Sequence, residues 1–276
     1  MKQKRGNNGD FHPKRSLGQN FLTDESLFQQ LVDLSGVGPE DAVLEIGAGA
    51  GGMTRALSAA CRRVIAIEVD GTLLPILRVA LEKCRNVDLV HGDVLRLNLP
   101  EITAPLGTFH IVANIPYYLT TDLMNLLLTS SMPIESISVM VQKEAAERIT
   151  AKPGEDGYGM LAVRAQYFYD PKIVLDVPSC MFTPPPKVDS AFVVMKRRTA
   201  PPVAVTDEAL FFRVAASAFA MRRKTMVNNL IASFRATRED AQWWLEQSGI
   251  APSARGETLS LQDFARICDA MKERKA

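Results

Sequence analysis

A glycine-rich string at residues 45–52 has the composition of a cofactor-binding loop. It reads Glu-Ile-Gly-Ala-Gly-Ala-Gly-Gly, follows a predicted strand and precedes a predicted helix. Glycine permits the tight turn and the close approach of backbone to ligand that such a loop requires. The spacing fits both G-x-G-x-G and G-x-G-x-x-G. Alone it therefore indicates a methyltransferase, a dinucleotide-binding enzyme or a purely structural turn.

Two acidic residues follow the next two predicted strands, where an adenosine-containing cofactor needs acceptors. Glu68 comes twenty-one residues after Gly47 and could accept hydrogen bonds from both ribose hydroxyls. Asp93 could accept from the exocyclic amine of adenine, although a strand-end Asp is often a helix cap. Because both acids are in register with the glycine string, the sequence favours a cofactor site. Its candidate residues are Glu45, Gly47, Gly49, Glu68, Asp93 and Val94.

The string Asn-Ile-Pro-Tyr at residues 114–117 ends the fourth predicted strand and suits methylation of an adenine amine. The N6 lone pair is delocalised into the ring, which makes this nitrogen a poor nucleophile. The Asn114 side chain and a nearby carbonyl could hold its hydrogens, while Tyr117 stacks on the base. A base that leaves its stack needs a second aromatic face. Phe182 in the proline-rich string 182–188 is the candidate, with a core aromatic as the alternative.

Short apolar runs separated by stretches that can be helical carry these strings. Near-continuous apolar strands of this kind predict a parallel sheet covered by helices on both faces, and thus an α/β fold. An amphipathic helix is expected over residues 24–35, ahead of the first strand. The predicted strands are Ala42–Ile46, Arg63–Glu68, Val87–Val90, Phe109–Asn114 and Ser136–Gln142.

Beyond residue 155 the pattern changes, and after residue 200 it becomes helical. Strands are predicted over 167–169, 173–177 and 191–196, with an extended proline-rich loop over 181–187. Helices are predicted over 207–219, 222–234, 238–247 and 261–272. We expect a basic, cofactor-contacting arm over 1–23, a cofactor-binding domain over 24–200 and an all-helical domain over 201–276.

The composition excludes several classes of protein. Apolar residues make up 47% and charged residues 23% of the chain, which predicts a packed core rather than disorder. No apolar run approaches the roughly 20 residues of a membrane helix, and the basic N-terminus has no secretion signal, so a cytoplasmic protein is expected. The four cysteines and three histidines are scattered, without zinc-binding spacing. We expect reduced thiols, no metal site and a monomer.

A net charge of +1 conceals basic flanks around an acidic centre. Residues 1–23 carry five Lys or Arg against one Asp, and residues 190–276 carry fourteen against nine acidic residues. Such flanks suit a polyanion, although a solvated basic face is an equal alternative on charge alone. The basic residues that could contact such a polyanion are Lys14, Arg15, Arg197, Arg198, Arg222, Arg223 and Lys224.

The Asn-Ile-Pro-Tyr string resembles the Asn-Leu/Ile-Pro-Tyr motif of the rRNA adenine N6,N6-dimethyltransferase family, and its small-subunit type in particular. Further matching strings occur in order along nearly the whole chain, at residues 14–22, 141–148, 158–159, 182–190, 222–230 and 255–260. Ile115 stands where Leu is common, which we expect to be neutral. Each string is weakly specific, but their ordered combination is highly specific.

The resemblance implies a class I, Rossmann-like sheet that binds S-adenosylmethionine, with a smaller all-helical C-terminal domain. It implies that Asn20 and Leu22 contact the methionine and sulfonium part of the cofactor, and that Asn114 bridges cofactor and target amine. Tyr117 and Phe182 would flank the target base.

The implied substrate is a pair of adjacent adenosines near the 3′ end of small-subunit rRNA, within a small ribosomal particle. Each adenosine would receive two methyl groups. Three alternatives remain at this stage: a large-subunit rRNA dimethyltransferase that confers antibiotic resistance, a mainly non-catalytic ribosome-assembly factor, and a nicotinamide-dependent oxidoreductase. The last would explain the glycine string and Glu68, but neither the Asn-Ile-Pro-Tyr string nor the basic flanks.

Overall fold

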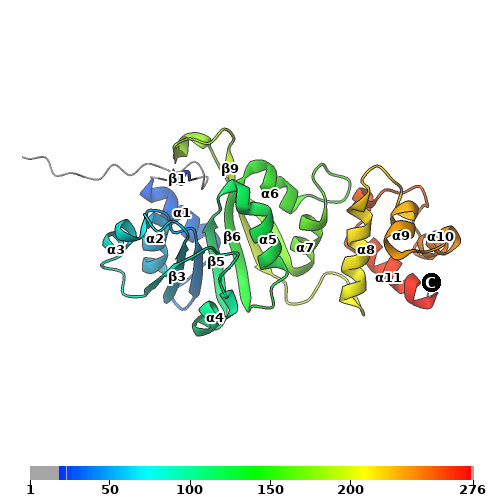
Figure 1. Cartoon of the computed structure of the whole chain (residues 1–276), viewed down its shortest axis with the longest axis horizontal. Helices are drawn as coiled ribbons and strands as arrows, with labels where there is room; N and C mark the ends of the chain where they lie inside the picture. Colours follow the sequence, from blue (N-terminus) through cyan, green and yellow to red (C-terminus); the bar gives the residue numbers. More distant parts are fainter. Residues whose placement is uncertain (1–18, 23, 275–276) are drawn as a thin grey trace, which may run out of the picture.

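The computed structural model describes residues 19–22 and 24–274, which form an α/β part followed by a helical part (Figure 1). Within these residues the chain builds a seven-stranded sheet in the order β4-β3-β2-β5-β6-β9-β7. The fold class predicted from the sequence is confirmed. The strands are β2 (Ala42–Ile46), β3 (Arg63–Glu68), β4 (Val87–His91), β5 (Phe109–Asn114), β6 (Ile134–Gln142), β7 (Tyr169–Val177) and β9 (Ser190–Arg197).

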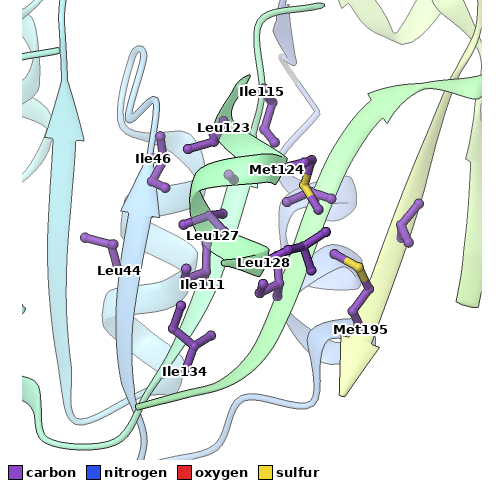
Figure 2. Close-up of a cluster of buried hydrophobic side chains, with 14 of the residues drawn as sticks. Leu44, Ile46, Ile111, Ile115, Leu123, Met124, Leu127, Leu128, Ile134 and Met195 are labelled. Atoms are coloured by element: carbon purple, nitrogen blue, oxygen red, sulfur yellow. The ribbon is translucent and has the colours of Figure 1, made fainter. Parts of the chain in front are cut away.

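Helices cover both faces of the sheet, as the continuous apolar strands predict. One buried cluster joins the sheet to α1–α3, and a second joins it to α4–α7. Figure 2 shows part of the second cluster, with Leu123 and Leu127 of α5 near Ile46 and Ile111 of the sheet. These helices are α1 (Glu25–Ser35), α2 (Gly52–Ala60), α3 (Leu74–Ala80), α4 (Leu99–Thr103), α5 (Thr120–Leu128), α6 (Lys143–Thr150) and α7 (Met160–Phe168).

The parallel pairing predicted for the five strands between residues 42 and 142 is confirmed, whereas the later strands, for which no direction was predicted, add an antiparallel edge. β2 to β6 pair in parallel, but β9 runs antiparallel to both β6 and β7. Residues 178–189 join β7 to β9 without the helical crossover that a parallel pair requires, and a short connection of this kind returns the chain antiparallel. The sheet is therefore mixed.

The strand predicted over 167–169 is also wrong for its first two residues. Tyr167 and Phe168 form the last turn of α7, and β7 begins at Tyr169. Aromatic residues favour strands, but this preference yields to packing. The Tyr167 ring lies 4.9 Å from that of Phe211 in the helical part, centroid to centroid, a contact that the helical turn provides.

Four helices make up the helical part, together with the short 3₁₀ segment η5 (Gly256–Thr258). The helix predicted over 222–234 begins only at Met226. Residues 221–224 form a turn, and Thr225 pairs with Arg255 in an isolated bridge. The helices are α8 (Glu208–Ala220), α9 (Met226–Phe234), α10 (Arg238–Gln247) and α11 (Leu261–Glu273).

A third buried cluster ties the helical part to α7 and to the segment before it. It includes Tyr158 and Tyr167 on one side and Phe211 and Phe264 on the other. The Tyr158 hydroxyl donates to the carbonyl of Leu259 at 3.0 Å. The two parts therefore share apolar packing rather than a bare linker. Among the described helices, none combines the length and the apolar character needed to cross a membrane.

Candidate active site

A cleft of about 530 Å³ opens beside the carboxyl ends of the parallel strands, where open α/β sheets bind ligands. The glycine string and the ends of β3, β4 and β5 form its walls, and two short strands described below close one side. Most of the candidate residues meet here. Those lining the cleft are Asn20, Leu22, Gly47, Gly49, Glu68, Asp93, Val94, Asn114, Tyr117 and Phe182.

The glycine string adopts backbone conformations that favour glycine. Gly47, Gly49 and Gly51 have φ values of 85°, 58° and 85°, all in the left-handed region. A Cβ atom on Gly47 would lie 3.3 Å from the carbonyl oxygen of Asn114. Bare backbone at this position thus lets the loop lie against the end of β5, with room for a ligand above it.

Glu68 ends β3 with its carboxylate held by backbone donors. Its two oxygens accept from the N–H groups of Gly49 and Asp70, each at 2.8 Å. Burial raises the pKa of Glu68, and the backbone donors oppose that shift. A carboxylate oxygen can accept more than one hydrogen bond. Glu68 therefore ties the glycine string to β3 and can still accept from a ligand hydroxyl.

Asp93 caps a turn after β4 and also lines the cleft. Its carboxylate accepts from the N–H of Leu95 at 3.0 Å and lies 3.4 Å from the Arg96 guanidinium. It also lines the cleft, as does the buried Val94. The turn that Asp93 caps holds its carboxylate at the end of β4.

Glu45 does not line the cleft. It lies within β2, 1% exposed, and burial reinforced by the charge of Glu68 raises its pKa to about 8. Within the described part of the chain, its Oε2 atom and the buried hydroxyl of Thr54 have no hydrogen-bond partner. The sequence gives no sign of this environment, because an acidic residue beside a glycine string is typical of a cofactor-binding residue.

Asn114 and Tyr117 occupy the opposite end of the cleft from Asp93. Asn114 is the last residue of β5, and the next N–H, that of Ile115, donates to the carbonyl of Met140 at 3.1 Å. The Tyr117 hydroxyl lies 2.8 Å from the hydroxyl of Ser190 at the start of β9. Burial raises the pKa of Tyr117. This contact fixes the ring, and Ser190 is a residue that sequence reasoning did not single out.

Two short strands form an antiparallel pair at the side of the cleft, which we call the clasp. β1 (Phe21–Leu22) pairs with β8 (Phe182–Thr183), so that Leu22 lies opposite Phe182. Phe182 is 3% exposed and still lines the cleft, so it serves as a loop anchor as well. Sequence reasoning singled out both residues but missed their pairing. It also missed Gln19, which donates to Asp70 at 2.9 Å.

The candidate RNA-binding residues fall into separate groups. Arg197 donates to the Tyr169 hydroxyl at 3.2 Å, and Arg198 lies 3.4 Å from Asp170, so both contribute to internal contacts. The turn between α8 and α9 carries a different set, which is exposed and pairs with no acid in the described part of the chain: Arg222, Arg223 and Lys224. Lys14 and Arg15 lie outside the described residues.

No group of three or more His, Cys, Asp or Glu side chains that could hold a metal ion occurs in the part of the chain that the structure describes. The free cysteines Cys61 and Cys268 are buried, and burial raises the pKa of each thiol.

Comparison with protein families gives one match across most of the chain. Residues 10–273 match the family described as ribosomal RNA adenine dimethylase. The chain is 43% identical over 269 residues to the ribosomal RNA small subunit methyltransferase A of Shouchella clausii, with 95% of this chain and 90% of that protein covered. The protein of the same name from Enterococcus faecalis is 41% identical, with 96% and 92% covered.

Solved structures with related folds include two transferases. The 23S rRNA methyltransferase ErmE has a TM-score of 0.73 at 25% identity, and the match covers 92% of this chain and 100% of that chain. A dimethyladenosine transferase from Plasmodium falciparum has a TM-score of 0.76 at 22% identity, covering 92% of this chain and 98% of that chain. The second likeness concerns the fold alone.

Proposed function

This chain belongs to the ribosomal RNA adenine dimethylase family, and on that premise we propose that it is an S-adenosylmethionine-dependent rRNA methyltransferase. Its substrate is a pair of adjacent adenosines in a hairpin loop near the 3′ end of 16S rRNA, each dimethylated at N6. One observation carries the proposal. A single cleft of about 530 Å³ contains both a donor and acceptor set for an adenosine cofactor and the Asn114–Tyr117 string.

The residues of the cleft fit S-adenosylmethionine. The bare backbone of Gly47 leaves space that a Cβ atom would fill, and carboxylates stand at the ends of two neighbouring strands. We assign Glu68 to the ribose hydroxyls, Asp93 and Val94 to the adenine, and Asn20 and Leu22 to the methionine end. Gly49 belongs to the loop that supports them, and Glu45 lies buried in β2 just before that loop. When bound, the cofactor supplies an electrophilic methyl group on a sulfonium.

Asn114 is the residue that orients the target amine. Its side-chain oxygen, together with a backbone carbonyl of the same string, accepts hydrogen bonds from the two N6 hydrogens. Holding both hydrogens helps to localise the nitrogen lone pair toward the methyl donor. The methylated nitrogen is cationic and acidic enough to lose its proton to solvent, so no separate general base is required. The rate gain then comes from positioning and from preorganised acceptors.

Tyr117 and Phe182 hold the target base between their rings. The hydroxyl contact with Ser190 limits rotation of the Tyr117 side chain, and the clasp limits movement of Phe182. Two fixed aromatic faces at one cleft suit a base that has left its stack. These two residues and Asn114 form the proposed catalytic set.

The RNA is bound mainly by the exposed turn that carries Arg222, Arg223 and Lys224. Such contacts bind phosphates and position RNA without reading its sequence. Arg197 and Arg198 contribute first to contacts within the α/β part, because their guanidinium groups already have partners there. Lys14 and Arg15 of the N-terminal arm are assigned to the same RNA.

The proposed assembly is a monomer that acts on a small ribosomal particle in the cytoplasm. We assign residues 24–200 to the cofactor-binding domain, residues 201–276 to the helical domain, and residues 1–23 to cofactor and RNA contacts. A hairpin presents little sequence that one protein face can read, so recognition depends on RNA shape and on the particle around it.

A large-subunit substrate is the second candidate, since the 23S rRNA enzyme shares this fold at 25% identity. Relatives that share 40–43% identity are small-subunit enzymes by name, which favours the small subunit. A mainly non-catalytic role in ribosome assembly is separated by the experiment below.

The proposal is tested with labelled S-adenosylmethionine and small ribosomal subunits that lack adenine dimethylation, followed by digestion and identification of the modified nucleoside. We expect N6,N6-dimethyladenosine with the wild-type chain, at least a hundredfold slower formation with Asn114→Ala, and an unchanged rate with the exposed control Asn98→Ala. Tight cofactor binding without transfer to either ribosomal subunit would refute catalysis and leave the assembly role.

A further inference from the structure

Tyr118 differs from the other tyrosines of this chain in its surroundings. It is 60% exposed, lines the cleft, and in the described part of the chain no hydrogen bond or ring contact holds it. Each of the other tyrosines has its hydroxyl in a hydrogen bond, with Ser190, Leu259, Glu208 and Arg197 as the respective partners of Tyr117, Tyr158, Tyr167 and Tyr169. An unattached aromatic ring at the mouth of a cleft is a free stacking surface.

The ring of Tyr118 faces a different direction from that of Tyr117. Both lie in the 3₁₀ segment η3 (Tyr117–Leu119). Because a 3₁₀ helix has three residues per turn, consecutive side chains diverge by roughly 120°. The two rings therefore cannot stack on the same base. The Tyr117 side chain points to its contact with Ser190, whereas the Tyr118 side chain lies away from that contact, at the mouth of the cleft.

Tyr118 also lies too far along the sheet to stack on the cofactor adenine. The acceptor for that adenine, Asp93, follows β4, whereas Tyr118 follows β5, three strands away in the order β4-β3-β2-β5. Strands are about 4.8 Å apart, so the two strand ends are separated by about 14 Å. The ring therefore belongs to the RNA end of the cleft.

We infer that Tyr118 stacks on the adenosine adjacent to the one in the pocket. This inference rests on the proposed function, which requires two neighbouring adenosines to be modified in turn. When one adenosine leaves its stack, its neighbour loses a stacking partner. Tyr118 supplies a replacement, and it does so whichever adenosine of the pair is the target. Tyr118 thus holds the RNA in place while the target changes from one adenosine of the pair to the other.

The kinetic test compares Tyr118→Ala, Tyr118→Leu and Tyr118→Phe in the full-length chain on small ribosomal subunits. Loss of one aromatic–base stack weakens binding by roughly fivefold to a hundredfold. We expect KM for the subunits to rise by that factor with Ala and with Leu, and to stay near the wild-type value with Phe. The affinity for S-adenosylmethionine should not change, and the exposed control Val79→Ala should behave as wild type.

A fluorescence test reports the stacking itself. Small subunits are assembled with RNA that carries 2-aminopurine in place of one adenosine of the pair, which leaves the other as the only target. Binding is confirmed by co-sedimentation. The emission of the wild-type and Tyr118→Phe complexes should be lower than that of the Tyr118→Ala and Tyr118→Leu complexes, because stacking quenches 2-aminopurine.

The outcomes separate the two proposals. A wild-type chain that modifies no adenosine would overturn the proposed function. A wild-type chain that forms dimethyladenosine, together with an unchanged KM and unchanged 2-aminopurine emission in Tyr118→Ala and Tyr118→Leu, would overturn only the role of Tyr118. The two replacements guard against a folding defect peculiar to one of them.

Discussion

At the scale of single residues, the cleft is built by contacts that hold side chains rather than by the side chains alone. Asn114 and Tyr117 are readable from the sequence because their types and order suit one reaction. Ser190 is not, because a serine at a strand start carries no signal until the fold brings it to the Tyr117 hydroxyl, at 2.8 Å. Thr54 likewise carries no signal in the sequence that it lies beside the buried Glu45.

The contact between Tyr117 and Ser190 can be tested as a unit. Tyr117→Phe and Ser190→Ala each remove the same hydrogen bond, worth about 1 kcal/mol, so each should lower kcat/KM about fivefold. Since the two changes act on one interaction, the double variant should be no slower than either single variant. Steady-state rates on small subunits provide the measurement. Additive losses would show that the hydroxyls act separately, and Ser138→Ala, another buried serine, is the control.

Glu45 makes stability depend on pH. Its pKa is about 8 in the folded protein, against an ordinary value of 4.5, so the folded chain keeps a proton that the unfolded chain releases. The free energy of unfolding therefore falls as pH rises from about 5 to about 8. The Gln side chain of Glu45→Gln cannot ionise. The free energy of unfolding of this variant, relative to that of wild type, should therefore rise by on the order of 3 kcal/mol across that pH range. Urea unfolding at both pH values measures this.

The control for Glu45 is the exposed residue Glu82. Glu82→Gln should give the same difference in unfolding free energy from wild type at both pH values. If Glu45→Gln also gives a difference that does not vary with pH, the buried carboxyl does not carry the proton.

At the scale of elements, the parallel strands are predictable, whereas the antiparallel edge is not. β2, β3 and β5 have the bounds that the apolar runs predict, because a strand buried on both faces is apolar throughout. The direction of β9 is decided by the connection over 178–189 and by pairing with β6, which no local pattern records. The clasp is invisible for the same reason, since β1 and β8 are only two residues each.

The glycine string offers a test in which strain and collision are separated. Gly47 and Gly36 both have positive φ, of 85° and 74°, but a Cβ atom meets Asn114 at 3.3 Å only at Gly47. Each alanine should lower the free energy of unfolding by about 1–2 kcal/mol. Only Gly47→Ala should weaken S-adenosylmethionine binding, by at least about tenfold, as measured by calorimetric titration. Equal cofactor affinities in the two variants would contradict the proposed cradle.

At the scale of the whole molecule, a net charge of +1 says little, since its distribution matters more. The exposed basic turn between α8 and α9 lies in the helical part, while α3 lies at the other end of the molecule (Figure 1). Each surface carries three exposed basic residues without an acidic partner in the described chain. On the second surface these are Arg78 in α3 and Lys83 and Arg85 just after it. The proposed function assigns RNA only to the first.

Replacing Arg222, Arg223 and Lys224 together with Gln should weaken binding to small subunits and flatten its salt dependence. The slope of log K against log salt concentration should decrease in magnitude by about 2, because three phosphate contacts are lost. Binding titrations at several salt concentrations measure the slope. The matched variant replaces Arg78, Lys83 and Arg85 with Gln and should leave it unchanged. Equal slopes in wild type and the first variant would remove the turn from the RNA interface.

The insertion of β9 between β6 and β7 has a consequence for biosynthesis. A chain emerges from the ribosome N-terminus first, so β6 presents an open, apolar edge until residues 190–197 have been made. The same late segment brings Ser190 to Tyr117, and the connection just before it brings Phe182 to β1. Closing the vulnerable edge and completing the cleft are thus one event. A nascent chain that stops short of β9 is both prone to aggregation and without a finished active site.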